Sequence, residues 1–235
     1  MVPLGACRSS PDERYAEGEA AYERGDHREA HRIWKPLADG GHALAQARIG
    51  VMYFNGEGVT RDDRQAVSYW TEAAEQGNLE AQIGLGNAYL SGRGVAKDLE
   101  KAATWWQMAA ERGHIDAQVG LGNAYLNGHG VDRDFAQAER WWKRAAAQGS
   151  AEAKFGLSNL YLSQAEGVRG SRAEGLKLLE EAAADGHAHA QYALGMLYEI
   201  GREVEQDVER ARELLEKAEA QGHRDAAERL RRMDE

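Results

Sequence analysis

The histidines are the first residues to consider as a chemical site, because imidazole is a common zinc ligand. A zinc role would fall to His187, His189 and His223 if the backbone brought them together. However, four histidines share one repeated place. Each follows a glycine that recurs every 36 or 37 residues: His42, His114, His187 and His223. Side chains one repeat apart are too distant to share an ion, so we predict no metal and no other cofactor.

Residues for catalysis are present without the patterns that catalysis needs. The segment Gly84-Leu85-Gly86 resembles part of a dinucleotide-binding motif, but we expect it inside a helix with no strand before it. No local signature of a Ser–His–Asp or Cys–His system is found. The carboxylates are spread over faces expected to be solvated. The sequence therefore favours a protein that is not an enzyme, and a hydrolase acting on cell-wall or β-lactam substrates is the alternative.

Cys7 is the only cysteine, which excludes an internal disulfide and a site of several cysteines. Leu4-Gly5-Ala6-Cys7 matches the lipobox, the pattern that precedes a lipidated cysteine. Only six residues come before Cys7, too few for the apolar export segment that normally precedes a lipobox, so we expect either that the given start is truncated or that Cys7 is an ordinary thiol. We expect a periplasmic protein, anchored to the membrane only through this lipid. The alternative is an ordinary thiol in a chain that, as written, would stay in the cytoplasm.

Composition limits the kind of partner. The chain has 29 basic and 39 acidic residues and a formal net charge of -10, whereas nucleic-acid binding needs basic patches. No run of about 18 apolar residues that could span a membrane is present. We therefore predict a protein partner and no nucleic acid.

A repeat organises the whole chain. The glycine noted above stands at positions 41, 77, 113, 149, 186 and 222. Within the first full unit, Ala45, Ile49 and Tyr53 recur every four residues, which predicts one helix with an apolar stripe. A second helix carries Ala66, Trp70 and Ala73 in the same way. Each repeat therefore predicts two helices, joined by a turn such as 56–58, where glycine allows a positive φ.

The later repeats depart from this pattern. The turn of the fourth unit is one residue longer, and Ser171 stands in place of the N-cap aspartate. In the fifth unit Glu203 replaces the second turn glycine. The aromatic pairs of the earlier units, which we predict to be core residues, give way to leucine pairs at 178–179 and 214–215. Small residues recur inside the first helix and predict a close approach between helices: Gly50, Gly86, Gly122, Ser158 and Gly195.

The chain resembles the Sel-one-like repeat family, a relative of the tetratricopeptide repeats. In the second unit the motif residues are Ala81, Leu85, Gly86, Tyr89, Gly92, Gly94, Val95, Asp98, Ala102, Trp106, Ala109, Ala110 and Gly113. The resemblance implies an all-α, right-handed α/α superhelical solenoid of about six two-helix repeats with capping helices at its ends. It also implies a scaffold or adaptor role, and names no partner because the motif residues are structural.

The domain organisation follows from the repeat. We expect a flexible tail at 1–12, an atypical helix pair at 13–40, five repeats at 41–223 and a polar capping helix at 224–235, with no linker between them. Terminal units of solenoids are usually atypical because they cover the last stacked face.

A groove on the first helices is the expected binding surface, since in tetratricopeptide-like solenoids the side opposite the core stripe faces the concave wall. An asparagine row can grip an extended backbone by donating and accepting hydrogen bonds. Beside it lie an apolar row and an acidic row. The three rows are Asn87, Asn123 and Asn159; Ile83, Val119, Phe155 and Tyr192; and Glu80, Asp116 and Glu152.

These rows have alternative interpretations. The asparagines could be merely solvent-exposed, or could form buried capping hydrogen bonds. A fourth row, Leu90, Leu126 and Leu162, could pack between helices instead of lining the groove. If the groove is open, it suits an amphipathic, basic segment of another protein.

The most concrete functional hypothesis comes from the resemblance. Some bacterial members of the family are immunity proteins that block a secreted toxin, such as a phospholipase effector of a type VI secretion system. Others are adaptors in secretion, polysaccharide export or signalling. We expect the first role, with the adaptor as the alternative.

Overall fold

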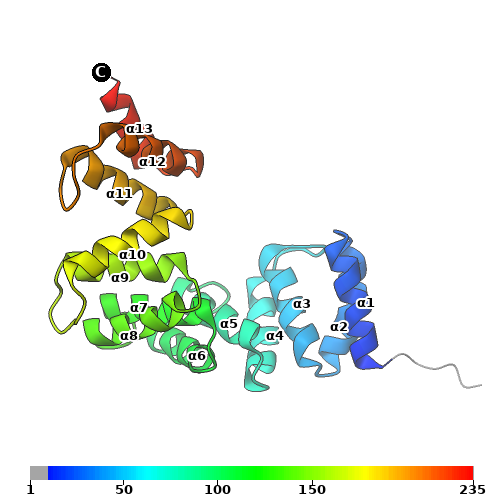
Figure 1. Cartoon of the computed structure of the whole chain (residues 1–235). Coiled ribbons are helices and arrows are strands. Elements are labelled where there is room, and N and C mark those ends of the chain that lie inside the picture. Colours follow the sequence, from blue (N-terminus) through cyan, green and yellow to red (C-terminus); the bar gives the residue numbers. More distant parts are fainter. Residues whose placement is uncertain (1–9, 235) are drawn as a thin grey trace, which may run out of the picture. The chain divides into compact units, whose positions relative to one another are not determined.

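The computed structural model describes residues 10–234, in which thirteen α-helices and no strands are found (Figure 1). Cys7 and its lipobox lie outside the described residues. Contacts divide the chain into two compact units, 1–112 and 113–235. The helices of the first unit are α1 Pro11–Glu23, α2 His27–Asp39, α3 Ala43–Asn55, α4 Asp63–Glu75, α5 Leu79–Ser91 and α6 Leu99–Glu111.

The second unit continues the same alternation of a first and a second helix in each repeat. Its helices are α7 Ile115–Asn127, α8 Phe135–Ala146, α9 Ala151–Leu162, α10 Arg172–Ala184, α11 Ala188–Ile200, α12 Val208–Ala220 and α13 Arg224–Met233. Within each unit, helices that follow one another in the chain pack together. The all-α repeat architecture predicted from the sequence is confirmed.

Side-chain caps decide where the helices begin. The Asp62 carboxylate accepts hydrogen bonds from the backbone N–H groups of Arg64 and Gln65, as the repeated aspartate predicts. Ser171 takes this role at α10 in a reciprocal capping box with Glu174. A second capping box at Ser10, followed by a proline at the first helical position, starts α1 at residue 11. The predicted boundary at residue 13 was therefore two residues late.

The turns between paired helices use positive φ where the sequence predicts it. Gly56 and Gly58 have φ of 77° and 69°. A Cβ on Gly58 would also lie 2.6 Å from the carbonyl carbon of His27, so both conformation and space require glycine. In the fifth repeat Glu203 holds the corresponding conformation with φ 65°, although it carries a side chain.

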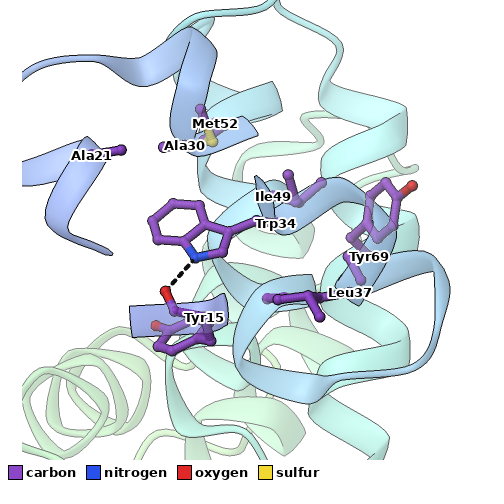
Figure 2. Packing of buried hydrophobic residues seen from close by; sticks show 10 residues of the cluster. Tyr15, Ala21, Ala30, Trp34, Leu37, Ile49, Met52 and Tyr69 are labelled. Carbon is purple, nitrogen blue, oxygen red and sulfur yellow. Dashed lines mark hydrogen bonds between the residues drawn. The ribbon is translucent and has the colours of Figure 1, made fainter. Parts of the chain in front are cut away.

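The core of the first unit is arranged around Trp34, which is completely buried (Figure 2). Its indole N–H donates a hydrogen bond of 3.0 Å to the backbone oxygen of Tyr15. Ile49, Leu37 and Tyr69 pack in the same cluster. One indole thus joins residues of α1, α2, α3 and α4, and its polar atom is satisfied.

Glycines inside the first helices make room for an indole ring. A Cβ added to Gly50 would lie 2.4 Å from the Trp70 ring, and one added to Gly84 would lie 2.8 Å from the other part of that ring. In the second unit Trp142 is enclosed in the same way by Gly122 and Gly156, at 2.2 Å and 2.9 Å. The small residues Gly50 and Gly122 therefore receive a tryptophan ring from the paired helix.

The leucine repeats solve the same packing problem with other residues. Ser158 replaces the glycine and is fully buried in the repeat that carries Leu179. At Gly195 the nearest atoms to an added Cβ are the Ala211 oxygen and Leu215, both 3.2 Å away. Leucine thus leaves more space above this position than tryptophan does.

Buried glutamines connect successive repeats, a feature that our sequence analysis missed. Gln46 is 1% exposed, donates to the backbone oxygen of Ala38 at 3.2 Å and accepts from Gln76 at 2.7 Å. In the fourth repeat the pair becomes Lys154 and Asp185, joined by an ion pair of 2.8 Å. The sequence contains a signal for this link, because the repeat with Lys154 at the position of Gln46 also has Asp185 at the position of Gln76.

Candidate protein-binding surface

The three predicted asparagines are exposed, which excludes the alternative of buried capping hydrogen bonds. Asn87 belongs to the first unit, whereas Asn123 and Asn159 belong to the second and line one hollow of about 510 Å³. Within residues 10–234 no hydrogen bond occupies their side-chain amides, which are therefore available to a guest. We name this cavity the asparagine hollow; it is lined by Asn123, Leu126, Phe135, Trp142, Glu152, Phe155, Gly156, Asn159, Leu160, Ser163 and Ala165.

The asparagine hollow combines an apolar floor with polar groups above it. Trp142 and Leu160 are buried in the core beneath, and Phe155 is half-buried. Glu152 is exposed, and its carboxylate has no ion pair among the described residues. Amide groups, a carboxylate and an apolar floor together fit a segment that carries both an apolar and a basic side chain.

The apolar row is only partly available. Val119 is 8% exposed and packs in the core cluster that contains Leu157, so its expected place on the groove wall was wrong. There it packs with residues of α8 and α9, among them Trp142 and Leu157. Ile83 is half-buried in the first unit. Tyr192 is stacked on His223 with ring centroids 4.5 Å apart, and only Phe155 of this row lines the hollow.

Members of the acidic row, and likewise of the leucine row, have different surroundings in the structure. The Glu80 carboxylate pairs with Arg48 at 3.0 Å, so its charge is largely balanced. Asp116 is exposed. Leu126 lines the hollow, whereas Leu162 packs against the core cluster of α10 and α11. The predicted surface therefore comes together in the second unit, around α7 and α9, and not as one continuous row.

Three of the histidines cap helices through a side-chain hydrogen bond, whereas His114 at the same repeated place makes no such bond. The Nδ1 atoms of His42, His187 and His223 each accept a backbone N–H at the start of a helix. His223 Nε2 therefore carries the proton and donates to His189 Nδ1, 3.0 Å away. Burial lowers the pKa of His187. In the described part of the chain no three metal-ligating side chains gather, and using His223 Nε2 for a metal would break its cap.

A buried carboxylate lies on the other side of α8. Glu139 is 6% exposed and accepts hydrogen bonds from Lys143 at 2.6 Å and Tyr161 at 2.8 Å. Burial opposes its charge, but these two bonds outweigh burial and lower the pKa of Glu139. Burial and the same bond raise the pKa of Tyr161 to about 12. The group is fully engaged in structure, which accounts for it without catalysis.

These features define a helical repeat protein whose repeated residues build the array and whose variable residues line its surfaces. The chain belongs to the Sel1 repeat family: that family's model matches five consecutive segments, at 43–78, 79–114, 115–150, 151–187 and 188–223. Sel1 repeats mediate protein–protein interaction, and their solenoid is typically non-catalytic. Among residues 10–234, no helix has the length and apolarity needed to cross a bilayer.

Solved structures give the same fold. A Sel1 repeat protein from Oxalobacter formigenes is 31% identical, with a TM-score of 0.83 over 90% of this chain and 86% of its own. A protective antigen of uropathogenic Escherichia coli is 29% identical, with a TM-score of 0.77 over 95% of this chain. This chain spans about half of that antigen, 51% of its length.

A third similar structure is an immunity protein from Pseudomonas aeruginosa. It is 26% identical and has a TM-score of 0.54, over 79% of this chain and 68% of its own. Comparison with the curated proteins gives no match. The chain is thus a Sel1 repeat scaffold, and some of the structures similar to it are named immunity proteins.

Proposed function

We propose that the asparagine hollow binds a protruding, amphipathic and basic segment of another protein. The observation that carries this proposal is the union, in one hollow of about 510 Å³, of Asn123, Asn159, Glu152 and Phe155. Two amides that no internal hydrogen bond occupies can grip a backbone, the carboxylate can pair with a basic side chain, and the apolar floor can receive an aliphatic one.

We further propose that this protein is an immunity protein that blocks a secreted toxic effector, such as a type VI phospholipase. The similarity to an immunity protein from Pseudomonas aeruginosa, at 26% identity, supports this reading. To block an enzyme, an immunity protein must cover the enzyme's active site or insert into it. A repeat scaffold offers a large surface for this and needs no catalytic residues. An adaptor role in secretion, polysaccharide export or signalling would use the same hollow.

The test begins with a pull-down from bacterial envelope extract, followed by calorimetry with the purified partner. Replacing Asn123 and Asn159 with alanine should weaken binding by at least about tenfold, since two polar contacts at a desolvated site are worth more than about 1.4 kcal/mol. Asn87→Ala, in the other unit, is the matched control and should leave the affinity unchanged. Circular dichroism checks that all variants remain folded.

The identity of the captured protein separates the alternatives. A toxic lipase whose activity falls on binding would support immunity, whereas a component of a secretion or polymer-export assembly would support the adaptor. Equal affinities for the wild type and the double variant would contradict the asparagine hollow as the site. Hydrolysis of a cell-wall or β-lactam substrate by the purified protein would revive the enzyme.

Periplasmic location with a lipid on Cys7 is a separate proposal, supported by the lipobox alone. Cells expressing the full-length gene and fed an alkyne-labelled fatty acid should label the protein, and Cys7→Ser should abolish the label. Fatty-acid label on the Cys7→Ser variant would contradict the lipid proposal. The proposal for the asparagine hollow would be unaffected.

A further inference from the structure

A second surface exists in the same unit, on the side of the second helices. It is a hollow of about 380 Å³ between α8, α9 and α10, which we name the Leu178 hollow. Its apolar floor is formed by Ala146, Leu157, Tyr161 and Leu178, and its rim by charged side chains. None of these residues belongs to the asparagine hollow.

The first unit shows what normally fills this place. Tyr69, the residue in the first repeat that corresponds to Leu178, stacks on Tyr53 with ring centroids 6.0 Å apart and an angle of 4°. Its hydroxyl donates to Asp39 at 2.8 Å, and the Lys35 ammonium lies 5.6 Å from its ring centre. Trp105 packs against the core at the corresponding place of the second repeat. An aromatic ring is therefore the side chain that this position is built to hold.

In the fourth repeat both the ring and its acceptor are missing. Leu178 stands for Tyr69 and Ala147 for Asp39, while Tyr161 and Lys143 correspond to Tyr53 and Lys35. Tyr161 and Lys143 keep the residue types of Tyr53 and Lys35 while the aromatic occupant is lost, so the hollow is the space that an aromatic ring would fill.

The fifth repeat also has a leucine at this place and a hollow beside it. Leu214 corresponds to Leu178, and a cavity of about 420 Å³ lies beside it, between α10, α11 and α12. Glu180 and Glu213 line it where the Leu178 hollow has Lys143 and Lys177. The two hollows thus share their shape-determining residue and differ in the sign of two charges.

Charge at the Leu178 hollow favours an acidic guest. The rim carries Lys143, Lys154, Arg169 and Lys177 together with Glu174 and Glu181. Lys143 is paired with Glu139 at 2.6 Å, and the Lys177 ammonium lies 3.9 Å from Glu181. Lys154 is held by ion pairs with Asp185 and Glu181, at 2.8 and 3.4 Å. Arg169 is exposed, and its guanidinium has no ion pair among residues 10–234. Arg169 is therefore the rim cation that is left to pair with a carboxylate of a guest.

We propose that the Leu178 hollow docks an aromatic side chain flanked by carboxylates, presented by a partner protein. The ring takes the place that Tyr69 occupies in the first unit, between Leu157, Tyr161 and Leu178. The carboxylates lie within reach of Arg169 and Lys177 at the rim. The inference goes beyond the asparagine hollow, which suits a basic segment, and it gives this unit two surfaces of opposite preference.

The probe is a fluorescein-labelled pentapeptide with one tryptophan between two pairs of glutamates, followed by fluorescence anisotropy. The wild-type protein should bind it saturably. Replacing its tryptophan with alanine, or its glutamates with lysines, should weaken binding at least about tenfold, because ring burial and charge pairing both contribute. Equal binding of the alanine peptide would overturn the proposal, since charge alone would then explain it.

Variants that rebuild the first unit give the sharpest test. Leu178→Tyr with Ala147→Asp supplies both the ring and its acceptor, so it should fill the hollow and weaken the peptide at least about tenfold. Leu214→Tyr fills the neighbouring hollow and is the matched control, with unchanged binding. Arg169→Glu, an exposed substitution that leaves the fold intact, should also weaken binding several-fold.

Further outcomes of the peptide-binding experiment also decide whether the Leu178 hollow is the docking site. No saturable binding by the wild type, or equal binding by the Leu178→Tyr and Ala147→Asp variant, would overturn the proposal. Indole-3-acetate that displaces the peptide with equal affinity would make the ligand a small aromatic acid and overturn the protein partner. The Asn123→Ala and Asn159→Ala variant should bind the peptide normally, so failure here and failure of the proposed function can be told apart.

Discussion

Helices α4 and α10 hold the same place in their repeats and are packed differently. In α4 the pair Tyr69 and Trp70 is buried, with Trp70 enclosed between two glycines. In α10 the pair is Leu178 and Leu179, a serine replaces the glycine, and a hollow opens. The backbone pattern survives both solutions. The comparison teaches that the motif residues secure the fold, and that departures from the motif create surface available for binding.

Removal of the enclosed indole is the largest expected effect. Trp70→Ala should lower the free energy of unfolding by about 3–5 kcal/mol, because both transfer energy and a cavity contribute. Leu179→Ala, at the same place in the leucine repeat, should lose nearer 2–3 kcal/mol, since a smaller side chain is removed. Chemical denaturation measures both values. A larger loss at Leu179 would break the comparison.

The glycine beside the indole should be the next most sensitive position. Gly50→Ala places a methyl group 2.4 Å from the Trp70 ring, so overpacking of about 1–3 kcal/mol should outweigh the gain of about 1 kcal/mol in helix propensity. Gly195→Ala meets its nearest atoms at 3.2 Å, a mild overlap that offsets the gain in helix propensity, so stability should change by less than about 0.5 kcal/mol. Equal effects at the two glycines would show that the indole is not the constraint.

Filling the Leu178 hollow should stabilise the protein by a smaller amount. Leu178→Tyr with Ala147→Asp restores the stacked pair and the hydroxyl hydrogen bond, and we expect a gain of about 0.5–1.5 kcal/mol. Leu178→Tyr alone should gain less because its hydroxyl lacks the acceptor. Thermal denaturation of the single and double variants measures the difference. A loss of stability in both variants would mean that the surroundings of Leu178 cannot accommodate a tyrosine ring as those of Tyr69 do.

The smallest effect concerns the caps of the two regions. Asn78 caps α5 and does not titrate, whereas His187 caps α11 and has its pKa lowered by burial. Because the unfolded histidine, with a pKa near about 6.5, binds protons more readily, the contribution of His187 is present above that pH and falls as the pH drops below it. His187→Asn should remove this part of the pH dependence.

Denaturation at pH values on either side of the histidine range measures that effect as a difference between wild type and variant. The other histidines are the same in both proteins, so their contributions cancel in the difference. At neutral pH the two should differ by less than about 0.5 kcal/mol, since asparagine is itself a good cap. The same pH dependence in both proteins would show that His187 does not contribute.

The predictions from sequence were strongest for features that depend on neighbours in the chain. The capping role of Asp62 and the positive φ of Gly56 follow from local chemistry, and both are confirmed. The exposure of Asn123 followed from helical periodicity alone. Val119 lies on the same helix and was predicted to line the surface, but it is buried. Its burial depends on how α9 packs beside it, which helical periodicity does not specify.

By itself the sequence determined the repeat, the helix pairs, the caps and the identity of most core residues, since each is encoded within a few residues of chain. Only the tertiary structure decided that Trp70 lies on Gly50, that Lys154 meets Asp185, and that a hollow remains beside Leu178. Those outcomes join residues of different helices that are distant in the chain. They depend on the volume and charge of side chains that meet in space, which a periodic pattern does not specify.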